Sequence, residues 1–297
     1  MPASNEFRTG YVAIVGRPNV GKSTLLNQLI GQKLSITSRK PQTTRQRITG
    51  ILTAESAQLL FVDTPGFQTR HGSALNRGMN RVVTQALSEV DVVLFVIEAL
   101  RFSPEDEAVL KLLPAQRPVL LVINKTDKLA ERGLLLPFMG QVSARFSFSE
   151  IVPISASKGH SIDELVRTTT QYLPVHPAIY GADEITESSE RFLAAELIRE
   201  KLFRLLGDEL PYVCAVLIDL FEMEGTMRRI HASIIVDKDS HKGILVGSKG
   251  SRLKEIGTQA RIDMEKLFGG KVYLEVWVKV KRGWSENRQV LKQLGYA

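Results

Sequence analysis

The sequence predicts a doubly wound α/β domain with a mostly parallel sheet, followed by a smaller α+β domain. In the first half, short apolar runs alternate with helical patterns, and a glycine-rich turn joins the first run to the first helix. The second half has a different order: helix, two strands, loop, helix, strand. Because 297 residues suit two domains, we expect a first domain at 1–174, a linker at 175–190 and a second domain at 191–297.

The glycine-rich turn spans Gly16–Ser23, between the apolar run 11–15 and a helical segment at 24–30. Strand, glycine-rich turn and helix form the context of a phosphate-binding loop, in which backbone N–H groups and the helix N-terminus face an anion. The lysine can reach the β- and γ-phosphates, and the serine hydroxyl can bind Mg²⁺. The candidate residues are Gly16, Asn19, Val20, Gly21, Lys22, Ser23 and Thr24.

The next segment, Ser35–Arg47, is polar, basic and without periodicity, so we expect a mobile loop. In P-loop NTPases this position orders when γ-phosphate and Mg²⁺ are present. A threonine hydroxyl there can complete the metal shell. Thr44 is the first choice and Thr43 the second, because spacing alone does not separate them.

A strand-like run, 58–62, ends at Asp63, and Gly66 follows three residues later. The carboxylate can hold Mg²⁺ through water, and the glycine N–H can contact the γ-phosphate. With Ser23 and Thr44, Asp63 completes the expected metal set, and the expected catalytic groups are Lys22, Thr44 and Gly66. Phe67 stands where Ras-type GTPases carry a water-orienting glutamine, which predicts slow intrinsic hydrolysis.

Two further strands, 92–97 and 119–123, flank a helix that begins with Ser103 and Pro104, and the second strand leads into Asn124–Asp127. An aspartate accepts both the N1–H and the amino group of guanine, whereas adenine offers no such pair of donors. We expect Asp127 to read the base, Asn124 to tie the loops together and Lys125 to pack on the base plane.

The last strand of this half, 151–154, ends at Ser155 and Ala156, whose backbone N–H groups would face the guanine carbonyl oxygen. A closing helix follows from Ser161 to about Leu173. The expected ligand loops therefore all lie at the carboxyl ends of strands.

In the second half, a Gly-x-x-Gly turn at 247–250 precedes a long helix, as in nucleic-acid-binding domains where the backbone approaches closely. The expected RNA contacts are Gly247, Ser248, Lys249, Gly250, Arg252 and Lys254. Groove lining and core packing explain Ile244, Val246 and Ile256 equally well. Trp277 is expected in the core. For Trp284, core packing and base stacking both remain open.

Charge and composition restrict the partners. The net charge is +7, and residues 242–292 hold twelve Lys/Arg against five Asp/Glu, an excess equal to that of the whole chain. Such a segment predicts a polyanionic partner, nucleic acid or an acidic membrane. The single cysteine, Cys214, excludes an internal disulfide. No membrane-spanning run, export signal or histidine metal spacing is found, so we expect a cytoplasmic protein.

The order of the motifs in the first half resembles the translation-factor-related GTPases, and the whole chain resembles the Era-like GTPase family, with a P-loop GTPase domain and a type II KH domain. The sequence 275–284 and the phenylalanine after Gly66 fit that family. The resemblance implies GTP/GDP and Mg²⁺ as ligands, binding of the single-stranded 3′ end of 16S ribosomal RNA, and a role in small-subunit (30S) assembly and rRNA maturation. It also implies loose inner-membrane association, and we expect a monomer. Relatives use the asparagine matching Asn19 to hold K⁺.

Our hypothesis is a two-state switch in which GTP and Mg²⁺ order the segments 35–47 and 63–80 and thereby change how the GTPase domain sits against the KH domain and raise RNA affinity. The alternative is a signalling or cell-cycle GTPase whose basic half binds a membrane surface. A passive RNA-binding module with an inactive nucleotide fold is a weaker reading, because Lys22, Ser23 and Asp63 are intact.

Overall fold

The computed structural model describes residues 6–38, 40, 43–67, 74–207 and 209–294. These residues form two compact units. The first comprises described residues of 1–35, 44–71 and 79–187, and the second those of 36–43, 72–78 and 188–297.

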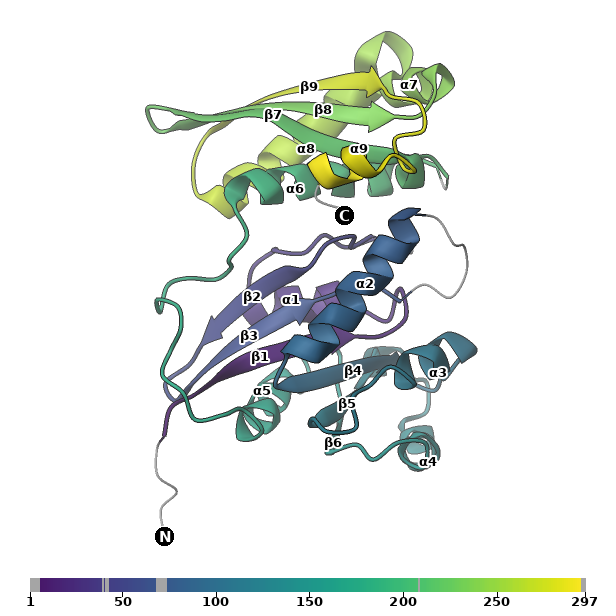
Figure 1. The fold of residues 1–297 in the computed structure, drawn as a ribbon, viewed down its shortest axis with the longest axis vertical. Coiled ribbons are helices and arrows are strands. Elements are labelled where there is room, and N and C mark those ends of the chain that lie inside the picture. Colours follow the sequence, from purple (N-terminus) through teal and green to yellow (C-terminus); the bar gives the residue numbers. More distant parts are fainter. Residues whose placement is uncertain (1–5, 39, 41–42, 68–73, 208, 295–297) are drawn as a thin grey trace. The chain divides into compact units, whose positions relative to one another are not determined.

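The first unit is built on a six-stranded sheet in the order β2-β3-β1-β4-β5-β6 (Figure 1). Only the β2/β3 pair is antiparallel, which confirms the doubly wound, mostly parallel sheet. The strands are β1 (Arg8–Val15), β2 (Ile48–Thr53), β3 (Ala57–Asp63), β4 (Val92–Glu98), β5 (Val119–Asn124) and β6 (Glu150–Pro153).

Helices cover both faces of this sheet. On one face, apolar side chains of β1, β4 and β5 pack against α2 (Ala74–Glu89), α3 (Pro104–Leu110) and α4 (Leu135–Ser143). The other face carries α1 (Lys22–Ile30) and α5 (Ile162–Gln171). Helix α3 begins as predicted, since Ser103 and Asp106 form a reciprocal capping box and Pro104 occupies the first turn.

Strand β2 was not predicted, because the period-2 pattern of 48–53 is interrupted by Gly50. A side chain at this position has no room: a Cβ on Gly50 would lie 2.8 Å from both Leu26 and Ile30 of α1. The glycine therefore lets the helix pack closely on the edge strand, a tertiary requirement that overrides strand propensity.

The segment expected as a linker runs along this edge. Ile51 donates its N–H to the Ile185 carbonyl at 2.9 Å, and the Thr186 hydroxyl donates to the Thr49 carbonyl at 2.6 Å. The Gln58 carboxamide oxygen accepts the N–H of Tyr180 at 3.0 Å. Polar composition predicted a connection, and the backbone hydrogen bonds give it a fixed path.

The second unit has a three-stranded sheet, β7-β8-β9, with α6 and α8 on one face (Figure 1). Strands β7 and β8 are antiparallel, and β8 and β9 are parallel. Its elements are α6 (Glu190–Leu205), β7 (Cys214–Glu224), β8 (Met227–Val236), α7 (Asp239–Val246), α8 (Ser251–Phe268), β9 (Val272–Val280) and α9 (Arg288–Gln293).

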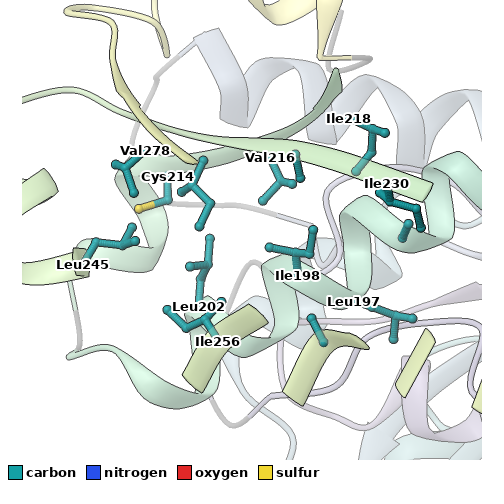
Figure 2. Packing of buried hydrophobic residues seen from close by; sticks show 14 of the residues in the cluster. Leu197, Ile198, Leu202, Cys214, Val216, Ile218, Ile230, Leu245, Ile256 and Val278 are labelled. Carbon is teal, nitrogen blue, oxygen red and sulfur yellow. The ribbon is translucent and has the colours of Figure 1, made fainter. Parts of the chain in front are cut away.

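The core of this unit lies between the sheet and the helices (Figure 2). Ile198 and Leu202 of α6, Ile256 of α8 and Val216 of β7 belong to this core, and all four are buried. Cys214 also lies in the core, where its thiol donates to the Leu210 carbonyl at 3.0 Å.

Two expectations for this unit are wrong. The expected loop before Gly247 contains the helix α7. The sequence pattern does not indicate this helix, because its first half is polar, Gly243 interrupts it, and Leu245 is its buried residue. Trp277 is 44% exposed on the outer face of β9, because the side chains of Val276 and Val278 take the inner face. Trp284 proves to be the buried tryptophan, and its indole N–H donates to the Val213 carbonyl at 3.0 Å.

Candidate functional site

The turn between β1 and α1 is shaped by two close backbone approaches. A Cβ on Gly16 would lie 2.3 Å from the Val96 carbonyl oxygen, and one on Gly21 would lie 2.3 Å from the Asn124 side-chain nitrogen. Asn19 adopts a left-handed conformation, with φ of 65°. No side chain caps the start of α1 at Gly21, so the N-terminal N–H groups remain available to an anion.

The ammonium group of Lys22 lies inside this turn. It donates to the carbonyl oxygens of Gly16 and Arg17 at 2.9 and 3.0 Å. Burial lowers the pKa of Lys22 to about 8, and the negative charge of Asp63 opposes that shift. A cation held among carbonyls at the start of a helix is placed to meet phosphate oxygens.

Hydroxyl and carboxylate oxygens gather next to it, at the ends of β3 and α1. The Ser23 hydroxyl lies 2.9 Å from the Thr44 hydroxyl and donates to Asp63 Oδ2 at 2.8 Å. The Ser35 hydroxyl donates to the same oxygen at 2.8 Å. Thr43, the second choice for this role, instead donates to the Lys40 carbonyl at 2.7 Å.

The chemistry of this cluster fits a magnesium ion. Burial raises the pKa of Asp63, and the charge of Lys22 works against that rise. Its Oδ1 is buried and has no hydrogen-bond partner among the described residues. An unpaired buried carboxylate oxygen beside two hydroxyls is a donor set of hard oxygens, as Mg²⁺ prefers. No group of three or more His, Cys, Asp or Glu that could hold a metal occurs in the part of the chain that the structure describes.

Ser35 was not among the predicted site residues, but it is buried and its hydroxyl donates to Asp63. It lies in a polar loop with no motif of its own, so only the contact between the loop and β3 reveals it. Its hydrogen bond orients the carboxylate, which makes it a positioning residue for the candidate metal ligand.

Gly66 lies against the phosphate loop. A Cβ at this position would lie 2.8–2.9 Å from three atoms of Pro18, so only glycine allows the two segments to approach so closely. The Thr64 hydroxyl donates to the Ile14 carbonyl at 2.9 Å and fixes the loop to β1. The ring of Phe67 packs on the sheet core and carries no hydrogen-bonding group.

The loops after β5 and β6 meet at Asn124. Its side-chain nitrogen donates to the Val20 carbonyl at 2.8 Å, and its oxygen accepts the N–H of Ala156 at 3.0 Å. Asp127 accepts the Ser155 hydroxyl at 2.5 Å, and this hydrogen bond lowers the pKa of Asp127. The carboxylate is exposed and ionised, as required of an acceptor that reads guanine.

A second link between these loops was not predicted. Glu98, at the end of β4, forms ion pairs of 3.1 Å with both Arg17 of the phosphate loop and Lys125 of the base loop. Arg17 is itself buried and also contacts Asp106 at 3.0 Å. Burial raises the pKa of Glu98, but the hydrogen bonds and charges of Lys125 and Arg17 outweigh it and the net shift is downward. Unlike Asp63, Glu98 is not followed by a recognisable motif in the sequence, so only the structure identifies it.

In the second unit, the turn before α8 requires left-handed backbone. Gly247, Lys249 and Gly250 have φ of 71°, 48° and 79°. A Cβ on Gly247 would lie 2.9 Å from the Arg252 Cβ. Helix α8 begins at Ser251 without a side-chain cap, which leaves N–H groups at its start for a phosphate.

A groove of about 350 Å³ continues from this turn along α8 and β9. Of the residues expected to contact RNA, Gly250 and Lys254 line it, whereas Gly247, Ser248, Lys249 and Arg252 belong to the turn and its flank. The lining residues that were not predicted are Leu253, Gly257, Thr258, Arg261, Leu274 and Val276. Ile256 belongs to the core instead, and Ile244 is exposed outside the groove.

Among the described residues, no helix has the length and apolar composition that a membrane span requires.

Comparison with known proteins agrees with this geometry. A family model described as "50S ribosome-binding GTPase" matches residues 11–125, and a KH-domain model matches residues 209–285. The chain is 56% identical to GTPase Era of Nitrosomonas eutropha over 294 residues, 99% of each chain. It is 53% identical to GTPase Era of Chromobacterium violaceum over 289 residues, 97% of this chain and 98% of that one.

Two crystal structures cover 98% of this chain. One is an Aquifex aeolicus Era variant bound to GDP·AlF4⁻, with a TM-score of 0.94 and 43% identity over all of that chain. The other is Era in complex with MgGDPNP and nucleotides 1506–1542 of 16S ribosomal RNA, with a TM-score of 0.93 and 42% identity over 99% of that chain. With a guanine-type nucleotide site in one unit and a Gly-x-x-Gly groove in the other, the chain belongs to the Era family of GTPases.

Proposed function

We propose that this chain is a GTP-hydrolysing switch protein that binds the 3′ region of 16S ribosomal RNA and assists small-subunit assembly and rRNA maturation. One observation supports the proposal above the others. A single chain carries both the exposed, ionised Asp127 beside a phosphate loop and a basic groove next to a Gly-x-x-Gly turn. The relative solved with a GTP analogue and nucleotides 1506–1542 combines the same two ligands.

In the nucleotide half, charge on the phosphates is met by Lys22 and by N–H groups of the phosphate loop. Ser23, Thr44 and Asp63 would hold Mg²⁺, which supplies positive charge to the phosphate oxygens when it is bound. The N–H of Gly66 supplies a donor that no side chain obstructs. Phe67 cannot orient a water molecule, so we expect slow intrinsic hydrolysis that a partner or an ion accelerates.

Potassium is our candidate for that ion. Asn19 lies in the phosphate loop with a left-handed backbone, and its carboxamide oxygen is a suitable ligand for a monovalent cation. We expect faster GTP hydrolysis in potassium than in sodium buffer at equal ionic strength, with the difference lost in Asn19→Ala. Equal rates of the wild-type protein in the two buffers would refute a potassium role.

In the RNA half, Lys249, Arg252 and Lys254 supply positive charge around the turn, and the glycines let a sugar–phosphate backbone approach. The apolar floor of the groove offers a surface to unstacked bases. Single-stranded RNA presents both groups at once, whereas a duplex hides its bases.

The switch follows from linkage. If GTP raises the affinity for RNA, then RNA raises the affinity for GTP by the same factor. The segments that we expect to respond are 35–47 and 63–80, of which residues 39, 41–42 and 68–73 lie outside the described residues. A transition of these segments between an ordered and a disordered state would then change the RNA affinity.

The test is an RNA-binding titration in the presence of a non-hydrolysable GTP analogue or GDP. The probe is a labelled RNA of nucleotides 1506–1542, and the control is a large-subunit RNA of equal length. We expect tight, sequence-dependent binding that is about fivefold or more stronger with the analogue. Equal affinity for both RNAs would refute the ribosomal assignment, and equal affinity with both nucleotides would refute the switch.

A membrane-signalling role is the alternative, since basic charge also attracts acidic lipid. We infer a cytoplasmic monomer, because its RNA partner is cytoplasmic and each unit has its own closed core. Sedimentation with vesicles containing phosphatidylserine, in the presence and absence of the RNA, tests the alternative. Binding to vesicles that the RNA does not compete away would favour the membrane role.

A further inference from the structure

Helix α8 carries a glycine in its interior at position 257. Glycine destabilises a helix interior relative to alanine, because it adds backbone freedom to the unfolded chain. The other glycines of this region have evident reasons, such as the left-handed φ of Gly247 and Gly250. Gly257 has an ordinary helical backbone, so conformation does not explain it.

Packing within the folded chain does not explain Gly257 either. A Cβ added there would meet only Val276 Cγ2 at 3.7 Å, an ordinary van der Waals contact. By contrast, a Cβ on Gly247 would lie 2.9 Å from Arg252. The fold would therefore accept alanine at 257.

The space beside Gly257 is part of the groove of about 350 Å³. Leu253, Leu274 and Val276 form its apolar floor, and all three are only half-buried. The preceding residue, Ile256, is buried in the core (Figure 2). Gly257 itself lines the groove.

Two cationic side chains line this space, and one of them, Arg261, also forms an ion pair of 3.0 Å with Glu265. Lys254 and Arg261 line the same groove one turn before and one turn after Gly257. Gly250, the last residue of the turn that we assign to the RNA backbone, lines it as well. An apolar floor with cations at its edge suits a ring whose attached phosphates run along the outside.

We infer that Gly257 leaves the seat for one nucleobase of the bound RNA on the groove side of α8, and that its missing side chain sets RNA affinity. This inference depends on the proposed RNA binding. Gly257 would then destabilise the helix slightly in the free protein, and contacts with the bound base would offset that loss of stability. A methyl group there would fill space that the base needs, without disturbing any contact within the protein.

The experiment compares Gly257→Ala and Gly257→Leu in the full-length protein. RNA affinity is measured by fluorescence anisotropy with a single-stranded RNA from nucleotides 1506–1542 and a GTP analogue. We expect Gly257→Ala to weaken binding about tenfold and Gly257→Leu to weaken it more, because larger groups fill more of the seat. The melting temperature of Gly257→Ala should equal or exceed that of the wild type.

Two controls make the result specific. Gly140→Ala is the same substitution inside α4 of the first unit, where a Cβ would meet nothing within 4 Å, so RNA affinity should stay unchanged. The salt dependence supplies a second readout, because losing a base contact leaves the slope of log Kd against log salt unchanged. Lys254→Ala, which removes a phosphate contact, should reduce that slope by about one.

The outcomes separate this inference from the RNA-binding proposal. If Gly247→Asp abolishes binding while Gly257→Ala binds like the wild type, RNA binding stands and the base seat is wrong. A lowered melting temperature in Gly257→Ala would assign the glycine to the fold and also overturn the inference. Wild-type protein that does not bind the RNA would remove both proposals.

Discussion

At the scale of single residues, each candidate group has an environment that suits its task. Asp127 is exposed and its pKa is lowered by the Ser155 hydroxyl, so it is ionised and accessible to a base. Asp63 is fully buried, with one oxygen unpaired, as suits a group that faces a cation. The two carboxylates have the same chemistry and differ only in what surrounds them.

Replacing Asp127 tests how the base is read. In Asp127→Asn, one acceptor becomes a donor that faces the guanine N1–H or amino group, which removes a charge-assisted hydrogen bond. We expect GTP affinity to fall about ten- to hundredfold, from a loss of about 1.5–3 kcal/mol, and xanthosine triphosphate affinity to rise. Competition titrations with both nucleotides measure the exchange, and an unchanged preference for GTP would contradict the assignment.

The buried lysine predicts a pH dependence of nucleotide binding. The pKa of Lys22 is about 8 without phosphates, because burial disfavours its charge. Bound phosphates favour the ammonium form and raise this pKa, so binding takes up a proton when the free protein is deprotonated. GDP affinity should be insensitive to Lys22 below about pH 7 and should fall above pH 8 by up to about tenfold per pH unit.

Isothermal titration across pH 6.5–9.5 measures this dependence. Lys22→Arg keeps a positive charge at every pH. The GDP affinity of this variant should therefore be lower than that of the wild type, and residue 22 should add no pH dependence to it. A wild-type profile that stays flat to about pH 9.5 would mean that Lys22 remains protonated in its buried position.

At the scale of elements, the ends of neighbouring parallel strands bring distant residues together. Val15, Asp63, Glu98 and Asn124 all stand at or next to the carboxyl ends of β1, β3, β4 and β5. Asn124 and Glu98 then connect the phosphate loop with the base loop from two sides. The loops that we expect to bind the phosphates and the base therefore share their supports.

Removing the charge of Glu98 should loosen this link. In Glu98→Gln, Lys125 loses its acidic partner, whereas Arg17 keeps Asp106. We expect GDP to dissociate about three- to tenfold faster, corresponding to about 0.6–1.4 kcal/mol for a partly buried pair. Stopped-flow release of a fluorescent GDP measures the rate.

Glu107→Gln on α3 is the matched control, because Glu107 pairs with the exposed Arg145 away from the loops. Exposed pairs of this kind contribute little, so GDP release should stay at the wild-type rate. A double-mutant cycle of Glu98→Gln with Lys125→Met should show coupling, and additive effects would exclude a direct link between the two side chains.

At the scale of the whole molecule, charge is divided between the two functions. The excess of positive charge lies in residues 242–292, within the second unit, whereas the remainder of the chain is balanced. Polyanion binding should therefore respond to salt more strongly than nucleotide binding, which depends on enclosed contacts.

A salt series measures this difference in one protein. For a groove that engages about four nucleotides, log K for RNA should fall with a slope of about −3 against log salt. A threefold rise in salt would then weaken RNA binding about 27-fold, whereas GDP affinity should change far less. Equal slopes for RNA and GDP would mean that the basic segment does not carry the RNA contacts.

The sequence by itself determined the parallel sheet, the phosphate loop, the position of Asn124–Asp127 and the Gly-x-x-Gly turn. These features depend on local chemistry: apolar runs of strand length, glycines at tight turns, and polar groups directly after strands. Helix α3 was readable for the same reason, because its cap residues are consecutive in sequence.

Only the tertiary structure decided which residues support these loops and fill the core. Ser35 on Asp63, Glu98 between two loops, and Trp284 rather than Trp277 in the core all depend on which segments meet in space. The same is true of Gly257, whose meaning comes from the groove beside it. Local propensity decides where an element forms, but the partners of a side chain are set by burial and packing between elements distant in sequence.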